Sequence, residues 1–209
     1  PFAPKCIELL KQNSIEDIIL LPLYPQYSTT TTKSSLEDFQ EVANSHFNIK
    51  VIEPFFENDL FNRAIVKDIK NSVDETSEYN LIFSAHGLPQ KIVDNGDVYE
   101  KHINEHVKLL KALLHINEIK FESINLAYQS KVGPMKWLEP SLDTMLENFK
   151  EKKVLIYPIS FIIDNSETVF ELDIEYKEIA EDLGVTDYKV VKCMNDSDDF
   201  IEVVKDLIK

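Results

Sequence analysis

The chain has 209 residues, of which 44% are hydrophobic and 28% are charged, a composition typical of an ordinary globular protein. Its formal net charge of −15 argues against binding to nucleic acid, because proteins that hold a phosphate backbone need a surface rich in lysine and arginine. The same acidity disfavours a broad electrostatic attachment to anionic lipid. No apolar run approaches the roughly 20 residues that a membrane-spanning helix requires.

The N-terminal residues and the two cysteines bear on processing and on the cellular compartment. Residues 1–12 lack the basic start and the long apolar stretch of a signal peptide. The chain begins with Pro1, in a stretch that reads as a loop entering a helix, so we expect a chain truncated at its N-terminus. Cys6 and Cys193 are far apart and form no metal-binding spacing, so we expect both to be buried. This cysteine usage predicts a reducing, cytoplasmic environment.

Short β-branched apolar runs alternate along the chain with longer amphipathic stretches. After a short N-terminal helix, the predicted elements are, in chain order, a buried strand at 15–23, a helix at 34–47, a strand at 48–54, a helix at 58–73, a strand at 79–89, a helix at 98–116, a strand at 121–130, a helix at 138–150, a strand at 152–161, a helix at 164–183, a strand at 188–194 and a helix at 198–209. Strands that alternate with helices of this length indicate βαβ units and a largely parallel sheet.

Four unusual segments follow predicted strands. They are LYPQYSTTTTKSS (23–35), SAHGLP (84–89), YQSKVGPMKW (128–137) and DNSETVFELDIEY (164–176). Ligands of open α/β sheets bind beyond the carboxyl ends of the strands, so these segments predict a cleft along one edge. No GxGxxG or GxxxxGK[ST] motif is present, which leaves nucleotide binding unsupported.

His86 follows an apolar run and precedes Gly87, so it is expected to emerge on a turn at a strand's end. A histidine there can accept a proton near neutral pH or ligate a transition metal. Alternatively, it caps the turn through a ring hydrogen bond. His102 and His106 have i, i+4 spacing suited to a metal pair, but their charged amphipathic helix favours a solvated or packed role.

Glu167, Glu171 and Glu175 are spaced i, i+4, i+8, which stacks three carboxylates on one face of a helix. Like charges at this spacing cost about 0.2–0.5 kcal/mol per pair. A line of carboxylates directed into a cleft could conduct hydrated divalent cations or protons. Alternatively, Glu167 belongs to a helix cap and the other two face water.

The segment 128–137 holds the one tryptophan, Trp137, together with Tyr128 and Met135. An aromatic ring and a thioether beside a cleft would suit a flat apolar macrocycle, although core packing is the commoner role of such residues. Lys131 is a candidate partner for a propionate or, alternatively, for a surface aspartate.

Taken together, four blocks resemble signature blocks of the ferrochelatases, in the family's order and at suitable intervals. They are LPLYPQYSTTTTKSS, SAHGLPQKIVDNGDVYEKH, YQSKVGPMKWLEP and PISFIIDNSETVFELDIEY. The resemblance extends from about Leu21 to Asp196. It implies an α/β fold of two similar Rossmann-like halves with parallel sheets and a cleft between them, the first half being incomplete. The implied division is residues 1–54 for the remainder of the first half, 55–187 for the second half, and 188–209 for a strand and helix that pack back toward the first half.

The resemblance also implies roles for individual residues. The family's catalytic histidine and the acidic residue facing it fall on His86 and Glu167, as iron ligands or proton acceptors. Glu171 and Glu175 fall on an acidic ladder that passes metal or protons. The implied porphyrin-binding residues are Tyr27, Ser28, Tyr128, Lys131, Trp137 and Asn165. Asn165 occupies a position where ferrochelatases have a histidine, and because an amide cannot titrate, a proton relay must do without it or use water.

The implied activity is insertion of ferrous iron into protoporphyrin IX to form protohaem, a metal-chelatase (lyase) reaction with Fe²⁺ as substrate and no required cofactor. The expected partners are porphyrin and iron, without nucleic acid, in the cytoplasm and in peripheral contact with the inner membrane. Because the family's N-terminal region is absent, we expect residues 1–209 alone to have little activity. Two alternatives stay open, a cobalt or nickel tetrapyrrole chelatase and a non-catalytic protein that binds a tetrapyrrole or a metal.

Overall fold

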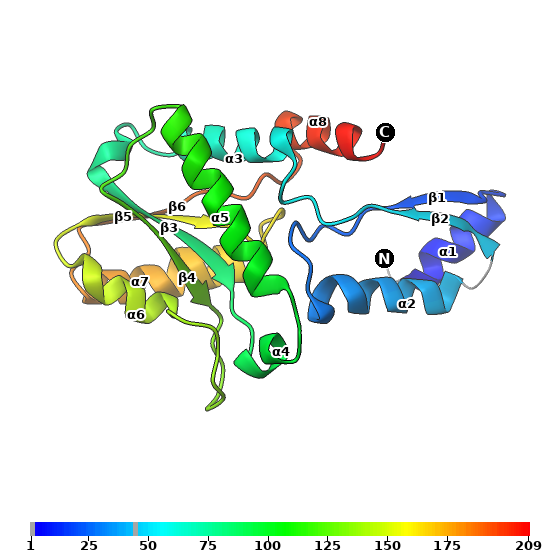
Figure 1. Ribbon diagram of the computed structural model, residues 1–209, viewed down its shortest axis with the longest axis horizontal. Coiled ribbons are helices and arrows are strands. Elements are labelled where there is room, and N and C mark those ends of the chain that lie inside the picture. Colours follow the sequence, from blue (N-terminus) through cyan, green and yellow to red (C-terminus); the bar gives the residue numbers. More distant parts are fainter. Residues whose placement is uncertain (1–2, 44–45) are drawn as a thin grey trace.

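The computed structural model describes residues 3–43 and 46–209. Its strands form two separate parallel sheets, one of two strands and one of four (Figure 1). This architecture confirms the predicted α/β fold with parallel sheets. Within the described residues, no helix is long and apolar enough to cross a membrane.

The small sheet belongs to an N-terminal unit that extends to one side of the larger sheet (Figure 1). The unit, here called the arm, comprises α1 (Ala3–Gln12), β1 (Asp17–Leu20), a π-helical turn η1 (Thr29–Lys33), α2 (Ser34–Ala43) and β2 (Asn48–Val51). β1 and β2 pair in parallel, with Asp17 opposite Asn48. The prediction of a buried first strand is wrong, since β1 alternates exposed and half-buried residues. In this two-stranded sheet each strand has a neighbouring strand on only one side, so both are edge strands and neither is fully buried.

Cys6 is a second correction within the arm. It lies exposed on α1, whereas Cys193 is buried as predicted. The one buried residue of α1 is its neighbour Ile7, so the helix turns only a narrow stripe inward and Cys6 lies off that stripe.

The larger sheet has the strand order β4-β3-β5-β6, and all its pairs are parallel. Its strands are β3 (Tyr79–His86), β4 (Ser123–Gln129), β5 (Lys153–Pro158) and β6 (Asp187–Val190). β3 lies between two neighbours and its first seven residues are buried, which explains their mostly apolar character. The carboxyl ends of β3 and β4 coincide, because His86 is paired with Gln129.

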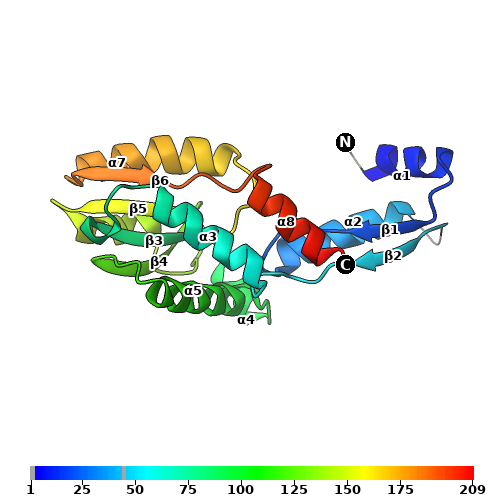
Figure 2. The same cartoon turned by 90° about the horizontal axis from the view of Figure 1, so that it is seen from above.

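Helices cover both faces of this sheet, with α5 and α7 on opposite sides (Figure 2). Alternate residues of β3 point to opposite faces. Leu81 and Phe83 join one buried cluster with α3 (Asp59–Asn71), α5 (Tyr99–Ile116) and α8 (Asp198–Leu207). Ile82 joins a second cluster with α6 (Leu142–Leu146) and α7 (Tyr176–Asp182). Short helical segments complete the chain, namely η3 (Thr76–Glu78), α4 (Gln90–Asp94) and η4 (Glu147–Phe149).

The closing strand and helix, which make up the predicted 188–209 segment, contact the larger unit. β6 pairs with β5 inside the larger sheet, and α8 packs on α3. The Asn58 side-chain amide, which precedes α3, donates a hydrogen bond to Asp206 of α8 at 3.0 Å. Both elements therefore complete the larger α/β unit, because their apolar faces are buried there.

Two predicted helices differ in form. The stretch 164–183 divides into a π-helix, η5 (Ser166–Glu175), and α7, and the Tyr176 amide donates to the Glu171 carbonyl five residues earlier. The helix predicted at 138–150 begins only at Leu142, because Pro140 disfavours helical backbone at the residue before it.

Candidate active site

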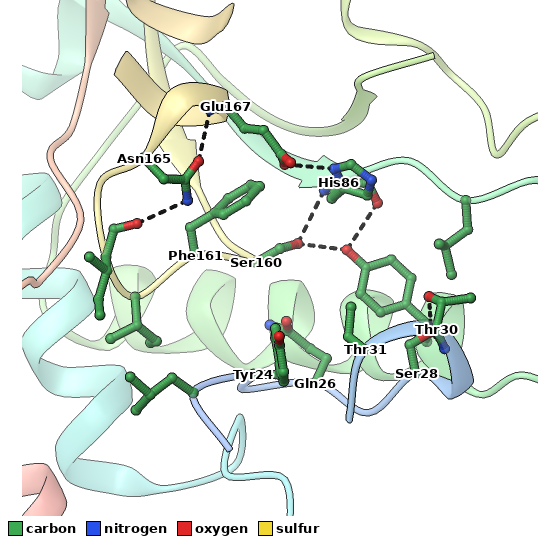
Figure 3. Close-up of a pocket in the computed structure, with 15 residues that line it drawn as sticks. Tyr24, Gln26, Ser28, Thr30, Thr31, His86, Ser160, Phe161, Asn165 and Glu167 are labelled. Atoms are coloured by element: carbon green, nitrogen blue, oxygen red, sulfur yellow. Dashed lines mark hydrogen bonds and ion pairs between the residues drawn. The ribbon is translucent and has the colours of Figure 1, made fainter. Parts of the chain in front are cut away.

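A pocket of about 370 Å³ lies between the arm and the carboxyl ends of β3 and β5 (Figure 3). The arm contributes the loop from Leu23 to Thr31, and the larger unit contributes the end of β3, the start of α5, the loop after β5 and the start of η5. This position agrees with the rule for ligand sites in open α/β sheets.

His86 and Glu167 meet at this pocket although they lie on different elements. The Nδ1 atom of His86 is 2.9 Å from the Oε2 atom of Glu167, and both side chains are partly exposed to the pocket (Figure 3). The hydrogen bond from His86, together with its charge when protonated, holds the pKa of Glu167 below its usual value despite partial burial. A carboxylate is therefore held beside an imidazole at the edge of the cavity.

The backbone of His86 is held on both sides by two hydroxyl groups. Its N–H donates to Ser160 Oγ at 3.2 Å, and its carbonyl accepts from the Tyr99 hydroxyl at 3.0 Å. The two hydroxyl oxygens lie 2.6 Å apart. Burial raises the pKa of the Tyr99 phenol well above its ordinary value, so this hydroxyl stays protonated and can donate.

Glu167 lies in the first turn of η5, and a capping box sets its position. The Asn165 side-chain oxygen accepts from the Glu167 amide at 2.7 Å, and the Thr168 hydroxyl accepts from the Asn165 amide at 2.9 Å. The preceding residue, Asp164, accepts from the Cys193 amide and from the Asn195 side chain. Asn165 thus has a structural role beside its place in the pocket lining.

The three glutamates of the predicted ladder have different environments. Glu167 lines the pocket, whereas Glu171 accepts hydrogen bonds from Ser130 Oγ at 2.6 Å and from Gln129 Nε2 at 3.2 Å. Glu175 is exposed on the surface. Within residues 3–43 and 46–209, no group of three or more His, Cys, Asp or Glu side chains is arranged to hold a metal ion. The described structure therefore brings His86 and Glu167 together but does not gather the four predicted metal residues into one cluster.

Of the six predicted porphyrin-binding residues, Ser28 and Asn165 line the pocket. The other four lie outside its lining. Tyr128 is buried in the core between β4 and α5, and the Tyr27 amide is bonded to His102. Lys131 forms an ion pair with Glu139 at 3.4 Å, while the Trp137 indole donates to the Val132 carbonyl at 3.1 Å. Sequence position alone could not separate these groups, because neighbouring residues of a strand or loop face opposite directions.

Three further lining residues had weaker sequence signals. Ser160 and Phe161 directly follow β5, so the strand-end rule could have selected them. Tyr99 opens a helix thirteen residues after His86 and carries no local signal. Of the solvated and packed roles predicted for His106, the structure shows the packed one, since its ring is fully buried between Gln26 and Asn62.

Comparison with known proteins identifies the family. The ferrochelatase family model matches residues 1–209. The ferrochelatase of a Nitratiruptor species is 51% identical over an alignment that covers 99% of this chain and 68% of that protein. The ferrochelatase of Sulfurimonas denitrificans is 50% identical, with coverage of 99% and 67%. The chain thus spans about two thirds of the length of these relatives.

A solved structure described as SirB from Bacillus subtilis with Fe3+ has a similar fold. Its TM-score is 0.68 at 11% identity, and the match covers 100% of this chain and 76% of that chain. At this identity the likeness concerns the fold alone. The family model and the sequence relatives carry the assignment, and the chain belongs to the ferrochelatase family.

Proposed function

We propose that this chain carries the catalytic pair of a ferrochelatase, which inserts ferrous iron into protoporphyrin IX and releases two protons. The observation that carries the proposal is the contact of 2.9 Å between His86 and Glu167 at the wall of the pocket. The family membership supplies the substrate class, porphyrin and iron. The reaction is that of a metal chelatase, a lyase, with Fe²⁺ as substrate and no resident cofactor.

His86 is suited to accept the pyrrole protons. Its Nδ1–H donates to the Glu167 carboxylate, which leaves the lone pair of Nε2 free to accept a proton. Once the ring is protonated, the adjacent carboxylate stabilises the imidazolium. Because a planar porphyrin holds its N–H groups in the ring plane, the pocket must bend the macrocycle to expose them. Glu167 is also suited to receive the cation, as a carboxylate oxygen donor at the pocket's edge.

The first test is His86→Ala in the full-length gene product, with His115→Ala as a matched control on the exposed end of α5. Iron insertion under anaerobic conditions, and zinc insertion followed by porphyrin fluorescence, measure the activity. We expect His86→Ala to lose at least about 100-fold in turnover, the range of a lost general base, with unchanged circular dichroism. His115→Ala should keep the wild-type rate. Turnover of His86→Ala close to that of the control would refute the role of His86.

The same assay separates the alternatives. A cobalt or nickel chelatase would insert those metals into a less oxidised tetrapyrrole and leave protoporphyrin unmetallated. A non-catalytic binding protein would quench porphyrin fluorescence without forming the metalloporphyrin.

For the cellular setting, we propose a cytoplasmic protein that touches the inner membrane only peripherally. Exposed apolar side chains at the pocket, among them Leu23 and Ile163, support such a contact. Co-sedimentation with vesicles of bacterial lipid, compared for wild type and Leu23→Ser, tests it, and equal recovery in the absence of vesicles is the control. Failure of the wild-type protein to sediment with vesicles would refute the contact.

A further inference from the structure

A buried histidine lies behind the pocket wall and is separate from the catalytic pair. His106 of α5 is 0% exposed, and its ring packs against Phe61 with centroids 5.8 Å apart and against Phe56 at 5.9 Å. Burying a polar ring among apolar side chains costs free energy unless both ring nitrogens have hydrogen-bond partners. Both nitrogens of His106 have such a partner, and the partners show which nitrogen carries the proton.

The partners define the protonation state of the ring. The Gln26 side-chain nitrogen can only donate, so Nδ1 of His106 accepts its hydrogen bond at 2.8 Å. The Asn62 side-chain oxygen can only accept, so Nε2 of His106 donates to it at 2.8 Å. The side-chain nitrogen of Asn62 donates to the Phe56 carbonyl at 2.8 Å, and this bond fixes the orientation of the Asn62 side chain. The ring is therefore neutral and carries its proton on Nε2.

Gln26 connects this ring with the pocket. It is 2% exposed, lines the cavity, and is drawn beside Tyr24 in Figure 3. Its amide nitrogen also donates to the Ile159 carbonyl at 3.1 Å, directly before the lining residues Ser160 and Phe161. His106 thus provides the acceptor that holds a residue of the arm against the loop after β5.

The neighbouring residues of the arm are anchored to the same helix. The Tyr27 amide donates to Nδ1 of His102 at 3.2 Å, and the Ser28 hydroxyl donates to Asp97 at 3.0 Å. Three consecutive residues of the pocket loop are therefore held by groups at the start and on one face of α5. Of these acceptors, His106 is the most deeply buried, so loss of its Nδ1 would leave the Gln26 amide with one partner fewer inside the protein.

We propose that His106 is a positioning residue, which acts through Gln26 to set the arm's wall of the porphyrin pocket. The identity of the ligand as a porphyrin rests on the proposed function, whereas the anchoring of Gln26 by His106 does not depend on it. Burial lowers the pKa of His106 to about 3, so the ring is a neutral acceptor near neutral pH.

A pair of substitutions separates positioning from packing. In His106→Asn the amide oxygen lies as many bonds from Cα as Nδ1 does, so it can accept from Gln26. In His106→Gln the amide nitrogen lies as many bonds away as Nε2, so it keeps the donor to Asn62 but loses the acceptor for Gln26. Gln is closer to His in volume, so a purely structural role predicts that His106→Gln is the milder change. If His106 positions Gln26, His106→Asn should be the milder change.

The first measurement is hydrogen–deuterium exchange of the peptide spanning residues 22–33, with the α3 peptide as reference, in the full-length gene product. We expect exchange of the loop to increase about fivefold in His106→Gln, as loss of one neutral hydrogen bond gives, and to stay near the wild-type rate in His106→Asn. Faster exchange in His106→Asn, or equal exchange in both, would overturn the proposal. If either variant fails to fold, Gln26→Leu, which cannot donate to His106, must give the same increase.

The second measurement is the dissociation constant for protoporphyrin IX by fluorescence quenching. We expect it to rise about fivefold in His106→Gln and to remain unchanged in His106→Asn. If the wild-type protein binds protoporphyrin IX and His106→Gln has the same dissociation constant, the proposal is overturned. A wild-type protein that binds no porphyrin would instead refute the proposed function, and the exchange experiment would still decide the anchoring.

Discussion

His86 owes its position to the strand that carries it. The seven residues before it in β3 are buried, and residues 80–84 are paired on both sides, so the strand's end cannot shift without disturbing the sheet. Ser160 and Tyr99 then hold the His86 backbone, and Glu167 holds the ring. The freedom left to the imidazole is small, which suits the proposed role of His86 as a proton acceptor at a defined place.

The direction of the pKa shift of Glu167 fixes the sign of its effect on stability. Its pKa is lower in the folded protein than the usual 4.5, so the ionised form stabilises the native state above that value. The contribution is lost as the pH falls through the folded pKa. We expect the difference in unfolding free energy between wild type and Glu167→Gln to persist near pH 7 and to shrink below about pH 4.5.

Urea unfolding at a series of pH values between about 7 and about 3.5 measures this difference. Other acidic groups are common to both proteins and cancel in the comparison. A difference that stays constant across the series would contradict the assignment of the shift to this pair.

Gly87, which follows His86, has a close contact that explains the absence of a side chain. A Cβ atom there would lie 2.7 Å from the Gln129 carbonyl oxygen and 3.4 Å from the Trp137 ring. The same carbonyl accepts the Gly87 amide at 2.9 Å, so it cannot withdraw without breaking that bond. We expect Gly87→Ala to lower the unfolding free energy by about 1–3 kcal/mol and to displace His86.

Thermal and urea unfolding measure the cost of Gly87→Ala, and zinc insertion reports the displacement of His86. Lys91→Ala, at an exposed position of α4, is the control and should change stability by less than about 0.5 kcal/mol. Wild-type stability in Gly87→Ala would show that the strand ends can separate freely.

At the scale of elements, two π-helical segments border the pocket, η1 in the arm and η5 in the larger unit. Each is preceded by an N-cap residue that lines the cavity and whose side-chain oxygen accepts from the backbone, Ser28 for η1 and Asn165 for η5. π-helical turns occur frequently at functional sites, and this arrangement agrees with that tendency. The caps therefore fix where each wall of the pocket starts.

Asp97 extends the cap of η1 across to α5. Its Oδ2 atom accepts from the Thr29 amide at 2.7 Å and from the Thr29 hydroxyl at 2.6 Å, and its Oδ1 atom accepts from the Tyr99 amide at 2.8 Å. Although partial burial opposes ionisation, the hydrogen bonds from Thr29 and Tyr99 hold the pKa of Asp97 below its ordinary value. The carboxylate is therefore ionised and joins two elements.

We expect Asp97→Ala to cost about 2–3 kcal/mol, because several donors lose a charged acceptor at a buried site. Urea unfolding measures the loss, and Asp94→Ala, at an exposed position of α4, should change stability by less than about 0.5 kcal/mol. Equal stability of the two variants would refute the role of Asp97 as a link between η1 and α5.

At the scale of the whole molecule, the arm and the larger unit have separate sheets and meet through loops. The pocket lies at that meeting, so its shape depends on side-chain anchors such as Gln26 and Asp97. A net charge of −15 adds a long-range repulsion that opposes the compact state.

Salt should relieve this repulsion. We expect the thermal midpoint at neutral pH to rise when sodium chloride increases from about 10 mM to about 200 mM, because the screening length falls from about 30 Å to below 10 Å. The control is the same titration near the sequence pI of 4.7, where the net charge vanishes and the rise should disappear. A midpoint that falls with salt at neutral pH would show that attractive ion pairs outweigh the repulsion.

The sequence by itself determined the fold class, the order of nearly all elements and the family. Periodicity and strand-end motifs are local features, and the four signature blocks are contiguous, so no tertiary information was needed to recognise them. Local sequence also predicted His86 at a strand's end and Glu167 in the first turn of a helix, and the structure has both residues there.

Only the tertiary structure decided which side chains of those blocks face the pocket. Ser28 and Asn165 line it while Tyr128 lies in the core, and β6 joins the larger sheet. The contact of His86 with Glu167 spans 81 residues of sequence, and that of Gln26 with His106 spans 80. Such contacts depend on how whole elements pack, since the direction of a side chain at a strand's end or in a loop is set by its distant neighbours and not by its local sequence.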